Sequence, residues 1–242
     1  MKILCLVPSL PEDLKLECRQ GILSQTIPVS RTLFIFNRMN GGTLASRVSF
    51  ALNRGLEKVN LAEYDYILRV DSDTVLGSDF IERNLNGLPD LAGNGGYVML
   101  IKVKTFLELM GGRFNSVSDD SYLIYKFKME GKRVKGIDDN LLETRLHKHS
   151  KKDSMFVGNI YYKVGYEPIH IFGFPFAKYT HGHSRRYEGD VIGYNPWWIV
   201  AGYMLTFLKR DSKFEFADRI WNYQVRRLLP MFTKRIEGVV AK

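Results

Sequence analysis

The chain has 242 residues, of which 45% are hydrophobic and 25% are charged, so it can bury a core as one large domain or as one domain with a small appendage. This composition excludes a disordered or low-complexity chain. The formal net charge of +9 indicates a polyanionic partner, either nucleic acid, an anionic membrane surface or a phosphorylated substrate, although a solvated basic surface would carry the same charge.

The beginning of the chain and its cysteines indicate a reduced compartment. Cys5 lies in an apolar segment and Cys18 in an expected helix, which does not suit a disulfide scaffold. The opening "MKILCLVPSL" has one lysine and a short apolar run, which favours a first buried strand over a signal peptide. We therefore expect a cytoplasmic location.

Strands and helices alternate from the start of the chain. "ILCLVPS" at residues 3–9 predicts a strand, and Ser9 with Glu12 has the form of a capping box for a helix that follows. "RTLFIFN" at residues 31–37 predicts a second strand. A second helix is expected after Gly42, because apolar residues recur on one helical face at Leu44, Val48, Leu52 and Leu56.

The next strand ends on acidic residues. "YDYILRV" at residues 64–70 predicts a third strand, and Ser78 with Asp79 can begin a helix that continues to Asn84. This alternation is typical of a mostly parallel sheet covered by helices on both faces. Ligands bind at the carboxyl ends of the strands in such sheets, and Asp71 and Asp73 follow such an end.

Asp71 and Asp73 have a spacing that suits a divalent cation. If the strand stays extended through Ser72, both carboxylates face the same side, and a cation relieves their repulsion. Magnesium or manganese is typically held by one or two carboxylates together with phosphate oxygens of the substrate. The alternative interpretation is an ordinary turn rich in Asp and Ser.

A second acidic pair, Asp119 and Asp120, precedes a helical pattern that contains Leu123 and Phe127 and ends at Gly131. Acidic residues at a helix start interact favourably with the helix dipole, which is one explanation of the pair. The functional explanation is that one of them is a general base that removes the proton of an attacking hydroxyl.

Four segments, taken in this order, resemble the family 2 glycosyltransferases with the GT-A fold. They are "LCLVPSLPEDLKLECRQGILSQTI", "YILRVDSDTVL", the glycine-rich "LMGGRF" and "VSDD", spread over about residues 3–135. The resemblance implies an α/β, Rossmann-like domain with a mostly parallel central sheet flanked by helices. It also implies an inverting transfer of a hexose from a nucleotide-diphosphate sugar to a hydroxyl acceptor, either a glycan or a lipid-linked molecule.

The resemblance also implies roles for the residues at the strand ends. Pro8 and Ser9 would contact the nucleotide base, with Asn37 nearby, where family members often have an acidic residue. Asp71 would bind the nucleotide sugar and share the metal, and Asp73 would be the principal ligand of Mn²⁺ or Mg²⁺.

For the chemical step, the resemblance implies that Asp120 is the base, with Asp119 as its close competitor. "HGHSRRYEGDV" resembles, in degraded form, the Gln-x-x-Arg-Trp segment of membrane-bound family 2 polysaccharide synthases, so Arg186 would cover the diphosphate. A basic exposed loop is the alternative. All five histidines lie between His147 and His183; we expect surface or hydrogen-bonding roles for them, and a third metal contact is the less favoured alternative.

The last part of the chain is hydrophobic and basic. Residues 191–208 carry no charge, but Asn195 and Pro196 shorten the continuous helix, which is then too short to cross a membrane. Trp197, Trp198 and the basic residues beyond suit a segment that lies in the membrane surface. A helical hairpin packed on the catalytic domain, or an oligomer contact, would give the same pattern.

We therefore predict a GT-A catalytic domain over residues 1–188 and a C-terminal helical extension over residues 189–242, peripheral on the inner face of the membrane. Two other classes stay open: a non-catalytic GT-A-like binding or scaffold protein, and a basic nucleic-acid-binding protein. The second is disfavoured because the sequence lacks an aromatic RNA-binding signature and zinc-finger or basic-zipper spacing. No nucleic-acid partner is expected.

Overall fold

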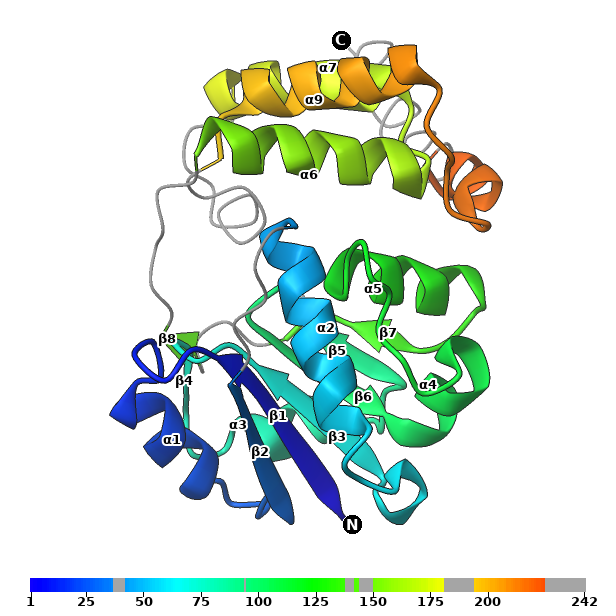
Figure 1. Ribbon diagram of the computed structural model, residues 1–242. Helices are drawn as coiled ribbons and strands as arrows, with labels where there is room; N and C mark the ends of the chain where they lie inside the picture. Colours follow the sequence, from blue (N-terminus) through cyan, green and yellow to red (C-terminus); the bar gives the residue numbers. More distant parts are fainter. Residues whose placement is uncertain (37–41, 94, 138–141, 144–149, 181–193, 225–242) are drawn as a thin grey trace, which may run out of the picture. The chain divides into compact units, whose positions relative to one another are not determined.

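Two compact units make up the chain, Met1–Leu146 and His147–Lys242. The structure is a computed structural model that describes residues 1–36, 42–93, 95–137, 142–143, 150–180 and 194–224 (Figure 1). The division comes earlier than the boundary at residue 188 expected from the sequence. The reason is that helices α6 (Lys151–Val164) and α7 (Pro168–Thr180) pack with α9 (Pro196–Lys209) in the second unit.

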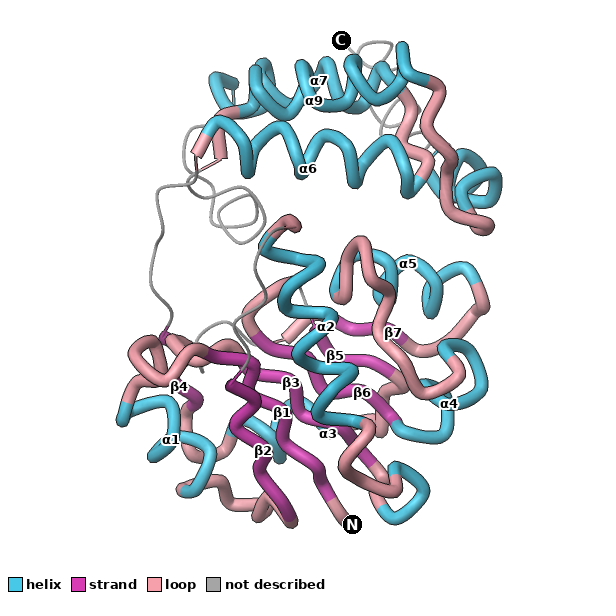
Figure 2. The backbone as a smooth tube through the Cα atoms, viewed as in Figure 1, coloured by secondary structure: helices cyan, strands magenta, loops and turns pink. Residues whose placement is uncertain are grey.

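A six-stranded mixed sheet forms the centre of the first unit (Figure 2). Its strands follow the order β2-β1-β3-β6-β5-β7. The pairs β1–β2, β1–β3 and β5–β7 are parallel, whereas β3–β6 and β5–β6 are antiparallel. The prediction of a mostly parallel sheet is confirmed, with an antiparallel strand at its middle. The strands are β1 (Ile3–Ser9), β2 (Arg31–Phe36), β3 (Tyr66–Val70), β5 (Leu91–Gly93), β6 (Val98–Lys102) and β7 (Val134–Lys135).

Helices cover the sheet on both faces, so the central strands are buried on both sides. In β1, Leu4 and Leu6 face one core cluster, and Ile3, Cys5 and Val7 face the other. The first cluster takes side chains from α2 (Leu44–Leu56), α4 (Val103–Met110) and α5 (Asp120–Met129). The second takes them from α1 (Leu16–Leu23) and α3 (Phe80–Leu85). A short 3₁₀ helix, η1 (Leu61–Glu63), and a separate antiparallel pair, β4 (Val75–Leu76) with β8 (Leu142–Glu143), complete the unit.

The first helix begins later than the sequence predicts. Ser9 is still the last residue of β1, and its hydroxyl donates to the carbonyl of Leu10 at 2.6 Å. A turn then follows, and α1 starts at Leu16 with Lys15 at its N-cap position and no side-chain cap. The predicted capping box of Ser9 and Glu12 is therefore wrong, because a turn separates the strand from the helix.

The second unit is helical, and α6 and α9 pack very closely. A capping box of Ser150 and Asp153 begins α6. A Cβ atom at Gly158 would collide with the carbonyl of Ile199, and one at Gly202 would collide with that of Met155. Glycine is needed at both positions, since the two backbones touch there.

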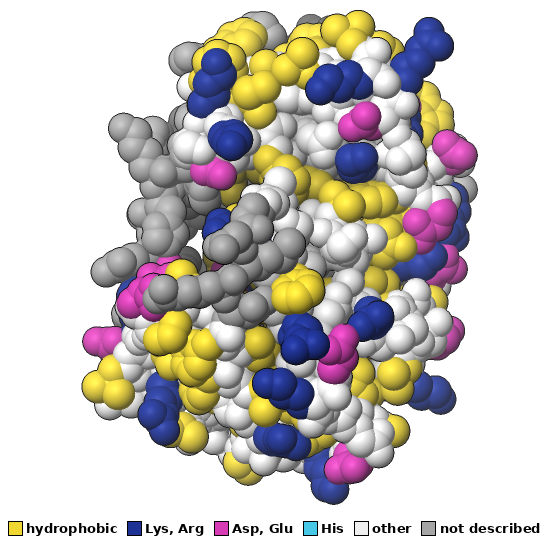
Figure 3. All heavy atoms as spheres, in the orientation of Figure 1, with side chains coloured by type: hydrophobic (Ala, Val, Ile, Leu, Met, Phe, Trp, Pro, Cys, Tyr) yellow, Lys and Arg dark blue, Asp and Glu magenta, His cyan; other side chains and the backbone are white. Residues whose placement is uncertain are grey.

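The face of the helical unit seen in Figure 3 combines hydrophobic and basic side chains. On α9, Trp197, Leu205 and Leu208 are 54%, 47% and 70% exposed, and Lys209 and Arg210 follow at its end. The 14 residues of α9 span roughly 21 Å, less than the roughly 30 Å of a bilayer core. Among the described residues, no helix is long and apolar enough to cross a membrane.

Candidate active site

A turn directly after β3 carries Asp71 and Asp73. The strand ends at Val70, and the amide of Thr74 donates to the carbonyl of Asp71 at 3.0 Å. The condition of an extended strand through Ser72 is therefore not met. The turn, rather than strand alternation, sets the positions of the two carboxylates, and the charge of Asp73 still acts on Asp71.

A buried arginine joins this turn to the second acidic pair. Arg69 of β3 has only 3% of its side chain exposed; its Nη1 lies 2.9 Å from Oδ1 of Asp71, and its Nη2 lies 3.1 Å from Oδ2 of Asp119. Nη1 of Arg69 has no well-aligned hydrogen bond, and neither has Oδ2 of Asp119. The contacts of Arg69 with Asp71 and Asp119 are therefore chiefly ion pairs. We refer to Asp71, Asp73, Asp119 and Asp120 with Arg69 as the acidic cluster.

Excess negative charge marks the acidic cluster. Burial raises the pKa of Asp71 to about 7; Arg69 opposes this rise, and Asp119, Asp73 and Asp120 add to it. Burial and Asp120 likewise raise the pKa of Asp119 to about 6 against the opposing effect of Arg69. Solvent screens part of the effect at Asp71, whose side chain is 33% exposed, whereas that of Asp119 is 5% exposed. Four carboxylates face the one guanidinium of Arg69, so the acidic cluster has a formal excess of negative charge.

Asp120 differs from Asp119 because its side chain is half-buried and is held by hydrogen bonds to one of its two carboxylate oxygens. It is the first residue of α5, and its Oδ1 accepts from the hydroxyl of Ser118 at 2.9 Å and from the amide of Ser121 at 2.5 Å. Its Oδ2 lies beside two glycines, where a Cβ atom would be 3.9 Å away at Gly95 and 3.4 Å away at Gly96. Small residues thus leave space next to this oxygen.

The start of α1 is fastened to the same turn. The amide of Lys15 donates to the carbonyl of Ser72 at 3.2 Å, and its Nζ lies 3.5 Å from the carbonyl of Asp73. The thiol of Cys18 lies 3.5 Å from the carbonyl of Asp71. Lys15 therefore brings a second cation to the acidic cluster, one that is only half-buried.

Comparison with known proteins assigns the fold. No family model matches the chain, and no curated protein matches it. Among solved structures, the mannosyltransferase PcManGT from Pyrobaculum calidifontis, in complex with GDP-Man and Mn²⁺, superimposes with a TM-score of 0.51 and 14% identity, over 93% of this chain and 80% of the other. The chain has the GT-A fold.

Other solved structures match less closely. Drosophila β1,4-galactosyltransferase 7, in complex with manganese, UDP-Gal and xylobiose, gives a TM-score of 0.45 at 15% identity, over 63% of this chain and 72% of the other. A197 from STIV gives a TM-score of 0.40 at 18% identity, over 57% of this chain and 82% of the other. The match to PcManGT, at 14% identity, shows the fold alone.

The residues predicted to bind the nucleotide sugar, where the structure describes them, lie at one edge of the sheet. Pro8 and Ser9 end β1, which runs parallel to β3, so they lie at the same edge as Asp71. Asn37 and Arg186 lie outside the described residues. Gly111 and Gly112 of "LMGGRF" end α4, where Gly112 packs near Leu107; the glycines beside Asp120 are Gly95 and Gly96.

The histidines add no metal ligand to the described part of the structure. His170 is the one histidine in the described ranges; it lies on α7, where burial lowers its pKa. The other four lie outside these ranges. Over the described residues, no group of three His, Cys, Asp or Glu side chains forms a ready-made metal site. A metal at the acidic cluster would therefore take further ligands from its substrate or from water.

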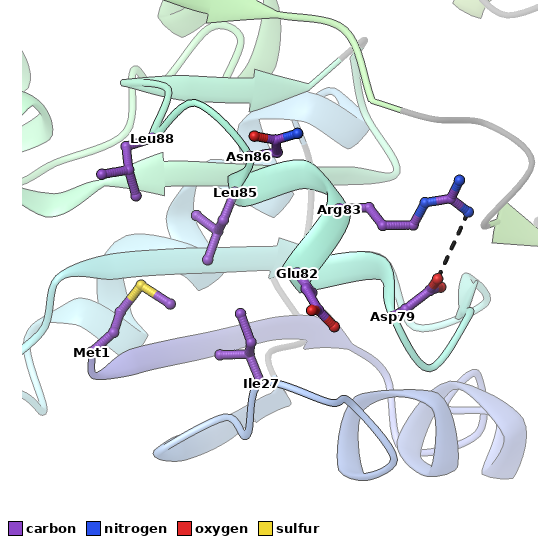
Figure 4. Close-up of a pocket in the computed structure, with 8 residues that line it drawn as sticks. All are labelled: Met1, Ile27, Asp79, Glu82, Arg83, Leu85, Asn86 and Leu88. Atoms are coloured by element: carbon purple, nitrogen blue, oxygen red, sulfur yellow. Dashed lines mark ion pairs between the residues drawn. The ribbon is translucent and has the colours of Figure 1, made fainter.

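A surface pocket opens at the opposite edge of the sheet (Figure 4). Met1, just before β1, helps to line it, whereas Asp71 follows the end of the parallel strand β3. An ion pair of 3.7 Å between Asp79 and Arg83 spans one side. None of the predicted site residues lines this pocket, which is formed by Met1, Ile27, Asp79, Glu82, Arg83, Leu85, Asn86 and Leu88.

The sequence did not disclose Arg69, Lys15, Gly95 or Gly96 as part of the site. Arg69 did leave a signal, because it is the one charged residue within the apolar run "YILRV", and a buried charge requires partners. The other three look like ordinary loop and helix-start residues.

Proposed function

We propose that the chain is a metal-assisted, inverting glycosyltransferase of family 2, which moves a hexose from a nucleotide-diphosphate sugar to a hydroxyl acceptor. The observation that carries this proposal is the acidic cluster, at the carboxyl edge of β3 in a GT-A fold. A mannosyltransferase of the same fold has been solved with GDP-Man and Mn²⁺, which supports both the substrate class and the metal.

Asp73 and Asp71 are the proposed ligands of Mn²⁺ or Mg²⁺. Carboxylate oxygens suit these hard cations, which commonly take one or two protein carboxylates together with phosphate oxygens. Oδ1 of Asp71 contacts Arg69, and the resemblance to family 2 gives the role of principal ligand to Asp73. When bound, the metal supplies Lewis-acid stabilisation of the departing diphosphate.

Asp120 is the proposed base. Its Oδ1 is fixed by Ser118 and Ser121, and its Oδ2 is left to accept the proton of the acceptor hydroxyl. The hydroxyl oxygen bonds to the anomeric carbon, the bond from that carbon to the diphosphate breaks, and the electron pair leaves with the diphosphate. One displacement inverts the anomeric centre. Asp119 suits this role less, because it is buried against Arg69.

The resemblance to family 2 supplies the proposed contacts of the nucleotide and its diphosphate. Pro8 and Ser9 would lie at the base, with Asn37 nearby, and Arg186 would cover the diphosphate. The half-buried Lys15 offers a further cation beside Asp73. Its ammonium would offset negative charge as the diphosphate departs.

The helical unit is proposed to lie on an anionic bilayer surface. Residues 147–242 contain 16 Lys and Arg against 8 Asp and Glu, so this unit carries +8 of the chain's net charge of +9. Exposed Trp197, Leu205 and Leu208 supply an apolar stripe on α9. A basic, amphipathic surface of this kind inserts its apolar side at the headgroup boundary and attracts anionic lipid. The acceptor would then be a glycan or lipid-linked molecule at the inner face.

A thermal-stability panel tests the proposed function. Nucleotide sugars, including GDP-mannose and UDP-galactose, are added with and without Mn²⁺, and we expect at least one to raise the Tm only when Mn²⁺ is present. Asp73→Ala should abolish this rise, and Asp79→Ala, in the pocket of Figure 4, should retain it. A panel with no stabilising sugar, or an unchanged response of Asp73→Ala, would contradict the proposal.

Vesicle sedimentation tests the membrane surface. The protein should sediment with vesicles that contain phosphatidylserine and much less with pure phosphatidylcholine. The double variant Leu205→Glu/Leu208→Glu should stay in the supernatant, whereas Leu88→Glu, an exposed leucine of the first unit, should bind like the wild type. Equal binding of both variants would rule out the α9 stripe as the contact.

A further inference from the structure

Arg69 occupies an unfavourable place for a charge. It lies in the third strand of the sheet order, between Leu6 of β1 and Met99 of β6, and both neighbours are fully buried. Burying a guanidinium in this way costs free energy, which its partners offset only in part, and an apolar side chain at such a site is often as stable or more so. The stability of the sheet therefore does not explain why this strand carries an arginine.

The contacts of Arg69 suggest what it does. It reaches Asp71 with one nitrogen and Asp119 with another. Asp71 begins the turn that carries Asp73, and Asp119 directly precedes Asp120. One planar side chain therefore touches the two segments, 48 residues apart in the sequence, that hold the proposed metal ligand and the proposed base. The fork of a guanidinium suits this bridge, and the single charge of a lysine does not.

We infer that Arg69 is a positioning residue and the resident counter-ion of the acidic cluster. It holds the Asp71 turn and the start of α5 in place before any metal or nucleotide binds. Its meaning for catalysis rests on the proposed function, but its role as a counter-ion does not. Without Arg69, a divalent cation becomes the main positive charge beside Asp71 and Asp119, since Lys15 lies at the carbonyl of Asp73.

The first test measures thermal stability and needs no sugar substrate. Arg69→Met leaves the buried Asp119 without its cation, so its Tm should fall by roughly 10 °C. Adding Asp119→Asn to that variant should restore most of the loss, because both buried charges are then gone. Arg133→Met is the matched control: Arg133 is exposed and donates to the carbonyls of Gly87 and Leu88 at the other edge, so the Tm of this variant should change by less than about 3 °C.

The same variants test the counter-ion role with MnCl₂ alone. The rise in Tm on adding Mn²⁺ should be larger for Arg69→Met than for the wild type, because the cation replaces a missing charge. The inference is overturned if Arg69→Met keeps the wild-type Tm, or if adding Asp119→Asn to it fails to restore the Tm. It is also overturned if Mn²⁺ raises the Tm of Arg69→Met and of the wild type equally. Should Arg69→Met not fold, recovery of a folded protein in the double variant supports the inference, and failure of both overturns it.

The second test concerns positioning. Arg69→Lys retains the charge but cannot bridge both carboxylates, so the protein should stay folded while kcat falls roughly ten- to a hundredfold. A wild-type kcat in this variant would overturn the positioning role. If the wild-type protein turns over no nucleotide sugar, the proposed function fails, and the thermal measurements still decide whether Arg69 is the counter-ion.

Discussion

Aspartates at the two edges of the central sheet have pKa values shifted in opposite directions. At the amino end of β5, Asp90 accepts from the hydroxyl of Thr105 at 2.8 Å and from the amide of Arg133 at 3.0 Å. Burial alone would raise the pKa of Asp90, but these hydrogen bonds and the nearby Lys102 outweigh it, so the pKa is lowered. At the carboxyl end, burial raises the pKa of Asp119 to about 6, because Asp120 adds to it and Arg69 does not compensate.

Under the proposed function, the difference separates a carboxylate that serves the fold from one that serves a ligand site. A carboxylate with well-placed donors stabilises the native state. A cluster with excess charge costs stability, and such clusters concentrate at functional sites. Neutralising a carboxylate should therefore harm activity at the acidic cluster and stability at Asp90.

The largest expected effect is on turnover. Asp120→Asn cannot accept a proton, so kcat for nucleoside-diphosphate release should fall by roughly 10²- to 10⁴-fold, with the Tm nearly unchanged. Asp90→Asn is the control, and it should retain the wild-type kcat at a temperature where it is folded. Equal activity of Asp120→Asn and the wild type would contradict the role of Asp120 as the base.

A smaller effect is expected on stability. Asp90→Asn weakens charge-assisted hydrogen bonds from Thr105 and Arg133 and should lower the free energy of unfolding by about 1–2 kcal/mol near neutral pH. Asp119→Asn removes a charge from an overcharged cluster and should lower it by less than about 0.5 kcal/mol, or raise it. Urea unfolding of both variants gives these values. A larger loss of unfolding free energy in Asp119→Asn than in Asp90→Asn would contradict this expectation.

The smallest effect is the pH dependence of these differences. Because the pKa of Asp90 is lowered on folding, its contribution is full above its unfolded pKa of about 3.9 and is lost as the pH falls through the folded value. Asp119 faces Arg69, Asp71 and Asp120. Because its pKa is raised on folding, its ionisation costs stability above about pH 6. That cost disappears as the pH falls towards about 4.

Unfolding at several pH values checks both signs. As the pH falls from about 7.5 to 5, the wild type should gain stability relative to Asp119→Asn. Over the same range, the difference in unfolding free energy between the wild type and Asp90→Asn should stay nearly constant. Below about pH 4 the difference from Asp90→Asn should shrink. Parallel curves for the two variants would contradict the opposite pKa directions.

Periodicity in the sequence predicted most of the fold. The stripe of α2 is buried at Leu52 and Leu56, and α5 buries Leu123 and Phe127 as expected. Leu44, at the start of the α2 stripe, is 64% exposed, because it lies at the first turn of its helix. Patterns that repeat along an element report its buried face, and they weaken at its ends.

The site was less predictable because its contacts join distant segments. Asp71, Asp73 and Asp120 stood out through local spacing, but Arg69 gains its meaning from Asp119, which no local pattern connects to it. The extended course assumed at Ser72 failed because the amide of Thr74 closes a turn on Asp71. Backbone hydrogen bonds of this kind do not follow from the residue types alone, since Asp and Ser suit strand ends and turns alike.

The most direct test of the central claim, that the acidic cluster binds a metal and a nucleoside diphosphate, is a crystal structure of the protein with Mn²⁺ and GDP or UDP. The account predicts an anomalous manganese peak roughly 2.0–2.6 Å from a carboxylate oxygen of Asp73, with diphosphate oxygens among the other ligands. A bound nucleotide with its manganese elsewhere, or manganese held by other residues away from Asp73, would contradict it.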